Sequence, residues 1–579
     1  MTYILGVNLS HDRSAAIVKD GEVLAAIEEE RLDRIKHSEG FLIQGHFERL
    51  TKLIPIKSIA YCLDAAGIGI DEVDLIVGNR PLGDRTVPRI LRDLPLKDKS
   101  KVRAFPFPSH HLAHAATAFY TSPFERAAVL IVDQAGSRSG EGMVEKHTLF
   151  TGSGVELTRV AETAYPVDYS DMSIGLFYDF FTAKLGFTTR YGTPDFGVFE
   201  CGGYPEAGKT MGLAPYGEPR PDWGRWLTFD GFDITVSQAG LEQIWKDIVA
   251  SDGAEFESLT ERRWDCRFAK DVARKVQDEL EEAMLHLAGE AHRRTGETRL
   301  CLGGGVMLNS VANHRVLAEG PFKEVFIPAP AGDSGVAIGA ALYGWHQILE
   351  GGTERRGQMT TAAYGQRYSQ ERVLEALQAY EGTLEWRQAP ISEVADLLAE
   401  HRIVAWVNGG SEMGPRALGH RSILADPRHP RVRDYLNDTV KHREPFRPYA
   451  PSVLAEAVED WFDFRGSSPF MLLVPSVRED RRDGLPAITH VDGTARVQTV
   501  DAAVDPEYHE LIAHFAERTG VPIVLNTSFN DNGEPIVETP EDALRTFART
   551  EIDHLYIEGY LVGKPGRELP ADHPARTRE

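Results

Sequence analysis

Apolar and polar positions alternate in short runs at the start of the chain. Residues 3–8, 15–18 and 23–27 are three such apolar runs, and Asp20-Gly21 separates the last two. Short runs of this kind that are joined by a glycine turn are typical of consecutive antiparallel strands. The chain is therefore expected to open with a three-stranded antiparallel meander.

A longer period marks the middle of the chain, where apolar residues recur every three or four positions from Phe268 to Leu287. This spacing predicts a long amphipathic helix. A short apolar run at 300–302, expected to be a buried strand, leads directly into three glycines at 303–305.

The apolar pattern lapses at 351–357, which are mainly glycine and charged residues. We place a domain boundary there, with domains at 1–352 and 353–579. In the second domain a helix around 394–398 and strands at 403–407 and 523–525 indicate α/β architecture. The polar, proline-containing residues after Lys564 are expected to form a loose tail.

Composition narrows the protein class. The 579 residues, 42% hydrophobic and 26% charged, fit a globular protein of two to four domains. The net charge of −24 argues against capture of nucleic acid or an anionic membrane. Four dispersed cysteines without a CxxC pair, no basic N-terminal leader and only short apolar runs predict a reduced, cytoplasmic protein.

Two histidines and two aspartates are candidate metal ligands. His110 and His114 are one helical turn apart, Asp133 ends an apolar strand, and Asp333 lies in a glycine turn. Two imidazoles and two carboxylates can share one ion. The alternative is that the histidines only pack or cap a helix. No glutamate follows His110, so an HExxH protease is excluded.

Three glycine-containing turns, at 135–140, 303–305 and 332–335, favour a nucleotide cleft in the first domain. Glycine allows backbone to approach a phosphate closely. Ordinary turns are the alternative at each place.

The second domain carries the densest set of cations. Arg416 and Arg421 lie in a glycine-punctuated run at 414–422, followed by Lys441, Arg443 and Arg447. Five cations in so acidic a chain predict a pocket for phosphate or carboxylate groups, because guanidinium groups bind oxyanions in bidentate fashion. Surface ion pairing is the alternative.

Three further segments contain candidate functional residues. The segment 526–530, after an apolar strand, offers amide and hydroxyl donors for a small polar substrate, or forms a simple turn. His11 follows the first strand and is a candidate general base, although a single histidine is more often structural. Another basic cluster consists of Arg34, Lys36 and His37. It is either part of a site or an ordinary solvated face of a helix.

Taken in order, these segments resemble the O-carbamoyltransferases of nodulation-factor and antibiotic biosynthesis, the group that includes the tobramycin and cephamycin enzymes. The resemblance runs almost from end to end of the chain. It rests on segments 6–16, 28–37, 110–115, 211–217, 304–309, 332–335, 414–422 and 526–530.

The resemblance implies an α/β protein with an N-terminal ASKHA domain (actin-like ATPase, ribonuclease-H-like) and a C-terminal YrdC-like domain. The second domain would convert carbamoyl phosphate and ATP into carbamoyl adenylate, phosphate and pyrophosphate. The first would then transfer the carbamoyl group to a hydroxyl of a small-molecule, antibiotic-like acceptor and release AMP. Neither nucleic acid nor membrane is an expected partner.

The resemblance also implies roles for individual residues. Six residues are expected to bind carbamoyl phosphate and ATP: Arg416, Lys441, Arg447, Arg496, Asn526 and Ser528. Arg416 and Lys441 are also expected to be catalytic. Those expected at a nucleotide in the ASKHA domain are Gly136, Gly304, Gly305 and Asn309. His110, His114, Asp133 and Asp333 would hold a divalent metal, Fe²⁺ in the best-described relative, although the ligand set also suits Zn²⁺ or Mn²⁺. Mg²⁺ would accompany ATP, and His11 would be the base for the acceptor hydroxyl.

This sequence departs from the family pattern in two places. Gln134 follows Asp133 where many relatives have glycine, and residues between 187 and 209 have no match. The unmatched segment is a candidate for shaping the acceptor pocket. The acceptor itself could be a sugar, a macrolide or ansamycin, a cephem or a lipo-oligosaccharide.

Four other functions share parts of this pattern. A tRNA threonylcarbamoyl enzyme is disfavoured by the negative net charge. A hydrogenase-maturation enzyme is disfavoured because we find neither CxxC zinc fingers nor an acylphosphatase domain in the sequence. A non-catalytic actin-like ATP-binding switch or a sugar kinase would have no need of the second anion pocket.

Overall fold

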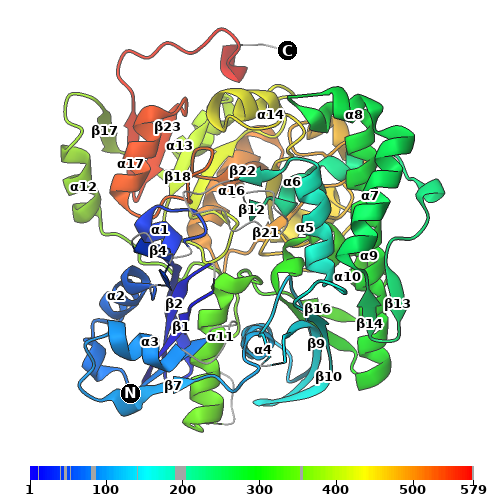
Figure 1. The fold of residues 1–579 in the computed structure, drawn as a ribbon. Helices are drawn as coiled ribbons and strands as arrows, with labels where there is room; N and C mark the ends of the chain where they lie inside the picture. Colours follow the sequence, from blue (N-terminus) through cyan, green and yellow to red (C-terminus); the bar gives the residue numbers. More distant parts are fainter. Residues whose placement is uncertain are drawn as a thin grey trace. The chain divides into compact units, whose positions relative to one another are not determined.

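The computed structural model describes residues 1–10, 12–38, 41–44, 49–52, 54–79, 86–139, 141–189, 204–352 and 357–576. The chain forms two compact units, one of Met1–Asp33 and His37–Met359, the other of Arg34–Lys36 and Thr360–Glu579 (Figure 1). We predict a boundary at 352/353, and residues 353–356 lie outside the described residues. So do His11, Gly140 and residues 190–203 of the unmatched segment.

The N-terminal unit contains two five-stranded sheets with the same strand order. The first runs β3-β2-β1-β6-β7 and the second β10-β9-β8-β15-β16. In each, the first three strands along the chain are antiparallel and two further strands are parallel to the first of them. This repeated topology is the one expected for an actin-like, ribonuclease-H-like domain, and the predicted opening meander is confirmed.

The strands of the first sheet are β1 Tyr3–Asn8, β2 Ser14–Lys19, β3 Glu22–Glu28, β6 Leu75–Asn79 and β7 Val102–Ala104. Those of the second are β8 Arg126–Val132, β9 Met143–Ser153, β10 Glu156–Pro166, β15 Arg299–Gly303 and β16 Glu324–Phe326. Three short antiparallel pairs are β4 Phe41–Gln44 with β5 Arg49–Lys52, β11 Thr188–Thr189 with β12 Tyr204–Pro205, and β13 Thr228–Asp230 with β14 Asp233–Thr235.

Two helices connect the sheets of this unit. α4 (His110–Tyr120) packs on β8 and β15 of the second sheet, and α11 (Val336–Tyr343) packs on β1, β2 and β6 of the first. The helices also pack on each other, at a point where a Cβ on Gly339 would lie 2.2 Å from the Ala113 carbonyl oxygen. Only glycine permits this approach.

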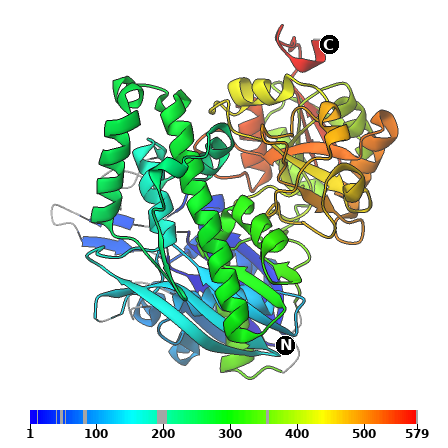
Figure 2. The ribbon, with the colours of Figure 1, turned by 90° about the vertical axis from the view of Figure 1, so that its right-hand side faces the viewer.

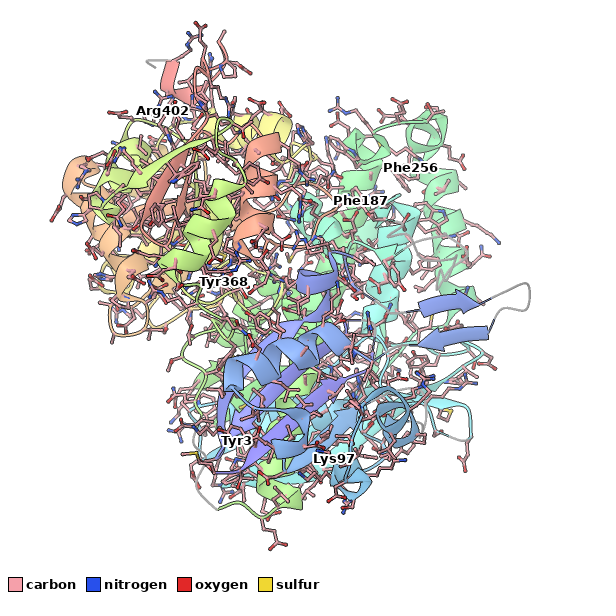
Figure 3. All side chains as sticks on the ribbon, turned by 90° about the vertical axis from the view of Figure 1, so that its left-hand side faces the viewer. Tyr3, Lys97, Phe187, Phe256, Tyr368 and Arg402 are labelled. Atoms are coloured by element: carbon pink, nitrogen blue, oxygen red, sulfur yellow. The ribbon has the colours of Figure 1, made fainter. Side chains whose placement is uncertain are left out.

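The remaining helices of the unit cover its edges and build a helical region around α9 (Arg267–Thr295). α9 is the predicted amphipathic helix, seen as a long green rod in Figure 2, and it ends at Gly296 in the left-handed conformation. The others are α1 Glu29–Asp33, α2 Ile56–Ala66, α3 Thr86–Asp93, α5 Ile174–Lys184, α6 Ala207–Leu213, α7 Gln238–Asp252, α8 Ala254–Ser258 and α10 Ser310–Glu319. In Figure 3, Phe187 and Phe256 of the helical region lie far from Tyr3 and Lys97 beside the first sheet.

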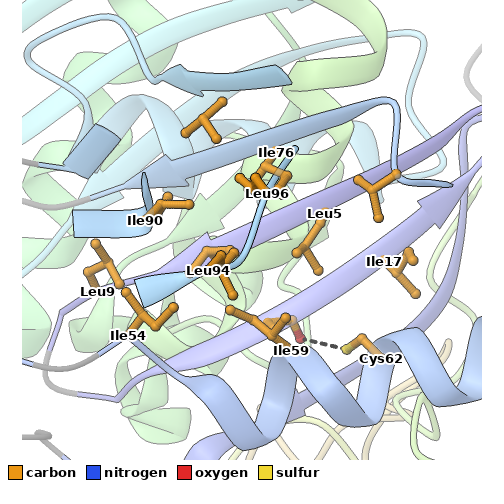
Figure 4. Close-up of a cluster of buried hydrophobic side chains, with 14 of the residues drawn as sticks. Leu5, Leu9, Ile17, Ile54, Ile59, Cys62, Ile76, Ile90, Leu94 and Leu96 are labelled. Atoms are coloured by element: carbon orange, nitrogen blue, oxygen red, sulfur yellow. Dashed lines mark hydrogen bonds between the residues drawn. The ribbon is translucent and has the colours of Figure 1, made fainter. Parts of the chain in front are cut away.

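The first sheet has a continuous apolar core on the face covered by α2. Leu5 and Ile17 on neighbouring strands pack with Ile76, Ile59 and Cys62, all at most 2% exposed (Figure 4). The Cys62 thiol donates to the Ala15 carbonyl, 3.5 Å away, and burial raises its pKa. Cys62 is therefore a residue of the apolar core.

The C-terminal unit is built on one mixed sheet of order β17-β24-β23-β18-β19-β22-β20-β21. Its strands are β17 Glu385–Gln388, β18 Val404–Val407, β19 Arg421–Ala425, β20 Ala450–Leu454, β21 Gln498–Val500, β22 Ile523–Ser528, β23 His554–Ile557 and β24 Tyr560–Gly563. Its helices are α12 Gln370–Gln378, α13 Ile391–Ala399, α14 Val432–Tyr435, α15 Val458–Trp461, α16 Pro506–Thr519 and α17 Pro540–Arg549. The helix and two strands predicted for this domain are confirmed as α13, β18 and β22.

The segment after Lys564, expected to be a loose tail, is anchored at His573. His573 is fully buried, and its Nε2 lies 2.9 Å from Asp553 Oδ2. Asp553 also accepts the Ile403 N–H just before β18. The imidazole attaches the tail to the central strands, which the polar composition of the segment does not reveal. None of the described helices has the length and apolar content needed to cross a membrane.

Candidate functional site

Four predicted metal ligands converge in the N-terminal unit. His110 Nε2 lies 2.9 Å from Asp133 Oδ2 and 3.3 Å from Asp333 Oδ1, and His114 Nε2 lies 3.5 and 3.4 Å from the same oxygens. The two imidazole nitrogens are 3.2 Å apart. All four residues are at most 6% exposed.

The fold explains why these four residues meet. The first two turns of α4 carry the two histidines on one face, Asp133 follows the end of β8, and Asp333 lies in the turn that leads into α11. Asp133 uses its other oxygen, Oδ1, to accept the Gly305 N–H at 2.9 Å. Two of the glycine segments thus shape the site through their backbones.

The donor atoms fit a divalent metal ion. Ligand atoms bound at about 2.0–2.2 Å to one four- or six-coordinate ion lie about 3.0–3.5 Å apart. The His–Asp separations of 2.9–3.5 Å lie within or close to this range before any side chain moves. The residues therefore could hold a metal, and the mixed nitrogen and oxygen set does not choose among iron, zinc and manganese.

The charges of the cluster favour a cation. Burial alone lowers the pKa of His110, but the charges and hydrogen bonds of Asp333 and Asp133 outweigh it and raise that pKa to about 10. Burial opposes ionisation of Asp133, yet hydrogen bonds from both imidazoles lower its pKa below the usual value. Two buried carboxylates beside two imidazoles thus attract protons or a dication.

Asn79 supports His110 from behind. Its amide lies 3.2 Å from His110 Nδ1 and 2.7 Å from Ser109 Oγ. As placed, Asn79 Nδ2 donates toward His110 Nδ1 and Asn79 Oδ1 accepts the Ser109 hydroxyl. Turning the carboxamide over would put Oδ1 at Nδ1, keep that nitrogen protonated and leave Nε2 for a metal. Asn79 was not among the residues predicted from the sequence. Its position at the end of the parallel strand β6 is the feature that could have indicated it.

A second cluster, of arginines, lies in the C-terminal unit. Burial, then repulsion from Arg447, lowers the pKa of Arg416 to about 10. Burial, then repulsion from Arg416, Arg443 and Arg447, lowers the pKa of Arg496. Guanidinium groups that repel one another while partly buried favour an anion among them.

Unpaired nitrogens point to the same conclusion. Arg496 Nε and Arg443 Nη2 are buried and have no hydrogen-bond partner among the described residues. Buried guanidinium nitrogens normally have acceptors. The cluster therefore has the donors and the charge to bind phosphate or carboxylate groups.

The loop that carries Arg416 is held by buried polar groups. One oxygen of Glu412 accepts the N–H groups of Leu418, His420 and Arg421 at 2.6, 2.9 and 3.2 Å. From the sheet, Asn526 Nδ2 donates to the Ala417 carbonyl at 3.2 Å and Gln498 Nε2 to the Leu418 carbonyl at 2.7 Å. Asn526, expected to contact substrate, is 1% exposed and supports this loop.

Lys441 and Ser528 are neighbours, as their shared role implies. The Lys441 ammonium, 4% exposed, donates to the carbonyls of Ser528 and Asn530 at 2.8 and 2.7 Å and to Asn530 Oδ1 at 2.6 Å. Burial, followed by repulsion from Arg443, lowers its pKa. No carboxylate is among these contacts, so the positive charge is not neutralised by them.

Arg421 does not belong to the anion cluster, which corrects the count of five cations. It is fully buried on β19, where its guanidinium donates to the carbonyls of Glu538 and Gly409 at 3.1 and 2.9 Å. Arg416 lies in the loop before β19 and Arg421 is the first residue of that strand, so nearness in the sequence does not put the two guanidinium groups in one cluster.

Other predicted residues have local partners. Asn309 caps α10 and exchanges two amide hydrogen bonds with Gln277 at 2.9 and 3.0 Å. A Cβ on Gly304 would lie 2.2 Å from the Val132 carbonyl, so this glycine is needed for the approach of two strands. Gly136 adjoins His111 and Glu145 in the same way. His11 lies outside the described residues.

Comparison with known proteins decides the family. Residues 3–86 and 84–342 match the family model for the carbamoyltransferase N-terminus, and residues 395–564 match that for the carbamoyltransferase C-terminus. The chain belongs to the carbamoyltransferase family.

Relatives cover nearly all of this carbamoyltransferase. It is 36% identical to "Uncharacterized protein sll1178" of Synechocystis sp., over 98% of both chains. It is 37% identical to nodulation protein NolNO of Sinorhizobium fredii, over 96% of this chain and 79% of that protein. It is also 37% identical to nodulation protein NolO of Bradyrhizobium diazoefficiens, over 79% of each.

Proposed function

We propose that this carbamoyltransferase makes carbamoyl adenylate from carbamoyl phosphate and ATP in its C-terminal unit, which we take to be YrdC-like. The carbamoyl group is then transferred in the N-terminal unit to a hydroxyl of an antibiotic-like small molecule. The arginine cluster carries the proposal, because an enzyme that joins two phosphorylated substrates must bind several negative charges at once.

In the first half-reaction water cleaves carbamoyl phosphate into carbamate and phosphate, and a carbamate oxygen then attacks the α-phosphate of ATP with release of pyrophosphate. Arg416, Arg447 and Arg496 bind the phosphates, and Arg443 adds a fourth guanidinium. Their positive charge offsets the charge that builds up on the phosphate oxygens. Lys441 adds its charge and, with Ser528 and Asn526, keeps the surrounding loops in place.

In the second half-reaction the acceptor hydroxyl attacks the carbamoyl carbon and AMP leaves. His110, His114, Asp133 and Asp333 would hold a divalent metal, Fe²⁺ being our proposal, which when bound acts as a Lewis acid toward phosphate oxygens. Gly136, Gly304, Gly305 and Asn309 line the nucleotide site on this proposal. The resemblance implies His11 as the base for the acceptor hydroxyl.

The test omits the acceptor. The purified protein is incubated with ATP, Mg²⁺ and carbamoyl phosphate, and pyrophosphate and carbamoyl adenylate are measured by enzyme-coupled assay and mass spectrometry. We expect pyrophosphate only when carbamoyl phosphate is present, and an Arg496→Ala variant should make at least about 100-fold less. Arg465→Ala is the matched control, because Arg465 is 89% exposed.

Other products would contradict the proposal. ADP instead of pyrophosphate would favour a kinase or an ATP-driven switch. Pyrophosphate that forms without carbamoyl phosphate would indicate a different carboxylate substrate.

A further inference from the structure

An imidazole–carboxylate pair lies in the N-terminal unit apart from the four metal ligands. His37 Nδ1 is 2.9 Å from Asp12 Oδ1, and the His37 N–H donates to Glu30 Oε2 at 2.7 Å. His37 has a φ of +60°, in the left-handed region that non-glycine residues seldom adopt. Such backbone strain is typically retained where a side chain must be held in one orientation.

The pair fixes which nitrogen of His37 is basic. An ionised carboxylate only accepts hydrogen bonds, so Asp12 keeps the proton on Nδ1, and the lone pair of the neutral imidazole is on Nε2. The His37 side chain is 34% exposed and that of Asp12 26%, so the imidazole is accessible to a small molecule. The Tyr204 ring, at the start of β12, lies 6.1 Å away.

The same turn is connected to the metal cluster through one buried amide. Asn8 Nδ2 donates to the carbonyls of Asp12 and Asp333, each at 2.9 Å. Asp12 and a metal ligand are thus neighbours through a single nitrogen atom. The backbone of Asp12 is therefore next to the turn that carries Asp333, in the unit to which we assign carbamoyl transfer.

Arg13 makes the arrangement rigid. It is 5% exposed, and its guanidinium donates to Ser38 O and Ser38 Oγ at 2.7 Å and to Ile54 O at 2.9 Å. The residues after His37 are therefore attached to the beginning of β2. Both partners of the pair are held by buried contacts, although the pair itself is partly exposed.

We infer that His37 is the proton acceptor for the acceptor hydroxyl and that Asp12 is its positioning residue. This inference rests on the proposed function. The hydroxyl oxygen forms a bond to the carbamoyl carbon, and its proton moves to His37 Nε2. The bond between that carbon and the adenylate oxygen breaks, the electron pair leaves with AMP, and water later removes the proton from the imidazolium.

The experiment separates the two half-reactions with glycerol as the hydroxyl donor. The full-length variants His37→Gln, Asp12→Asn and His11→Gln are compared with wild type. The readouts are carbamoyl-phosphate-dependent pyrophosphate, AMP release in a single turnover, and glyceryl carbamate by mass spectrometry. His514→Gln is the matched control, because His514 Nδ1 lies 3.1 Å from Glu517 Oε2 and is 30% exposed.

We expect His37→Gln to form pyrophosphate within twofold of wild type while AMP release and carbamate formation fall at least about 100-fold. Asp12→Asn should lower transfer about 10- to 100-fold without changing pyrophosphate formation. His37→Gly should regain transfer when imidazole is added, which a variant with only structural damage would not.

Several results would overturn the inference. These are a wild-type transfer rate in His37→Gln, equal loss of both half-reactions, and loss of transfer in His11→Gln alone. Asp12, Glu30 and His37 also offer three donor atoms within 4.8 Å. Loss of one bound-metal equivalent in His37→Gln would therefore indicate a cation site instead. If wild type releases AMP no faster than carbamoyl adenylate decays spontaneously, the role of His37 as a base is also excluded. Absence of pyrophosphate in wild type would instead refute the proposed function itself.

Discussion

At the scale of single residues, the buried His110–His114–Asp133–Asp333 cluster gathers two carboxylates and two imidazoles with almost no solvent. Each residue type alone is unremarkable in the sequence, since many HxxxH pairs only pack a helix. The convergence of four buried donor atoms from α4, the end of β8 and the turn before α11 gives a group that could hold a metal ion, which helix packing alone would not require.

His114→Ala is expected to weaken metal binding at least about 100-fold, because it removes one of four ligands that the fold already holds together. Metal content after purification and competition with a chromogenic chelator measure this. His286→Ala, on α9, is the control. Unchanged metal content in His114→Ala would mean that the ion binds elsewhere.

Glu412 gives the clearest pH dependence. Burial raises the pKa of this carboxyl, but the charge of His420 and the N–H groups of Leu418 and His420 outweigh burial and lower it below its usual value near 4.5. A lowered folded-state pKa means that the stabilisation is complete above about pH 4.5. It is lost as the pH falls through the folded-state value.

Glu412→Gln should therefore lower the stability of the C-terminal unit by about 1–3 kcal/mol at pH 7, and the difference from wild type should narrow at about pH 3.5. Thermal and urea unfolding at both pH values test this. A difference that grows on acidification would contradict the assigned charge state.

At the scale of secondary structure, the elements with strong periodicity were predictable. The meander β1–β3, the helix α9 and the strands β15 and β22 follow from local apolar spacing. The roles of Arg421 and Asn526 could not be predicted from local spacing, because tertiary contacts decide whether a polar residue faces a pocket or supports a loop. The Asp12–His37 pair was equally hidden, since its partners are 25 residues apart.

Two glycine substitutions test how closely the secondary-structure elements pack. Gly304 has a φ of +98°, and a Cβ would lie 2.2 Å from the Val132 carbonyl oxygen, so Gly304→Ala should destabilise the N-terminal unit by about 3 kcal/mol or more. Gly289 lies inside α9 with no atom within 4 Å of its would-be Cβ, so Gly289→Ala should stabilise by about 0.5–1 kcal/mol. Thermal unfolding compares both, and equal shifts would contradict the close strand approach.

At the scale of the whole molecule, the two candidate sites belong to different units, one built on two five-stranded sheets and the other on one mixed sheet. The charge of −24 gave no hint of the arginine cluster, because a local basic pocket vanishes in a sum over the chain. The resemblance carried the assignment of residues to half-reactions, and the structure adds the residues that support them.

Lys441→Ala should abolish pyrophosphate formation and retain metal, while His110→Ala should lose metal and still form pyrophosphate, with carbamoyl adenylate accumulating. The two substitutions act in separate units, so neither should change the other's readout. Pyrophosphate and metal content are measured on the same preparations. Equal loss of pyrophosphate in both variants would contradict this division.

The buried His573 has a practical consequence for anyone who modifies this protein near its end. Shortening the chain to residue 572 would strand the Asp553 carboxylate next to β18 without its imidazole, at a cost of about 3–5 kcal/mol. An affinity handle or fusion partner should therefore be joined so that His573 is retained, and a protease that acts on the chain from this side should slow sharply at His573.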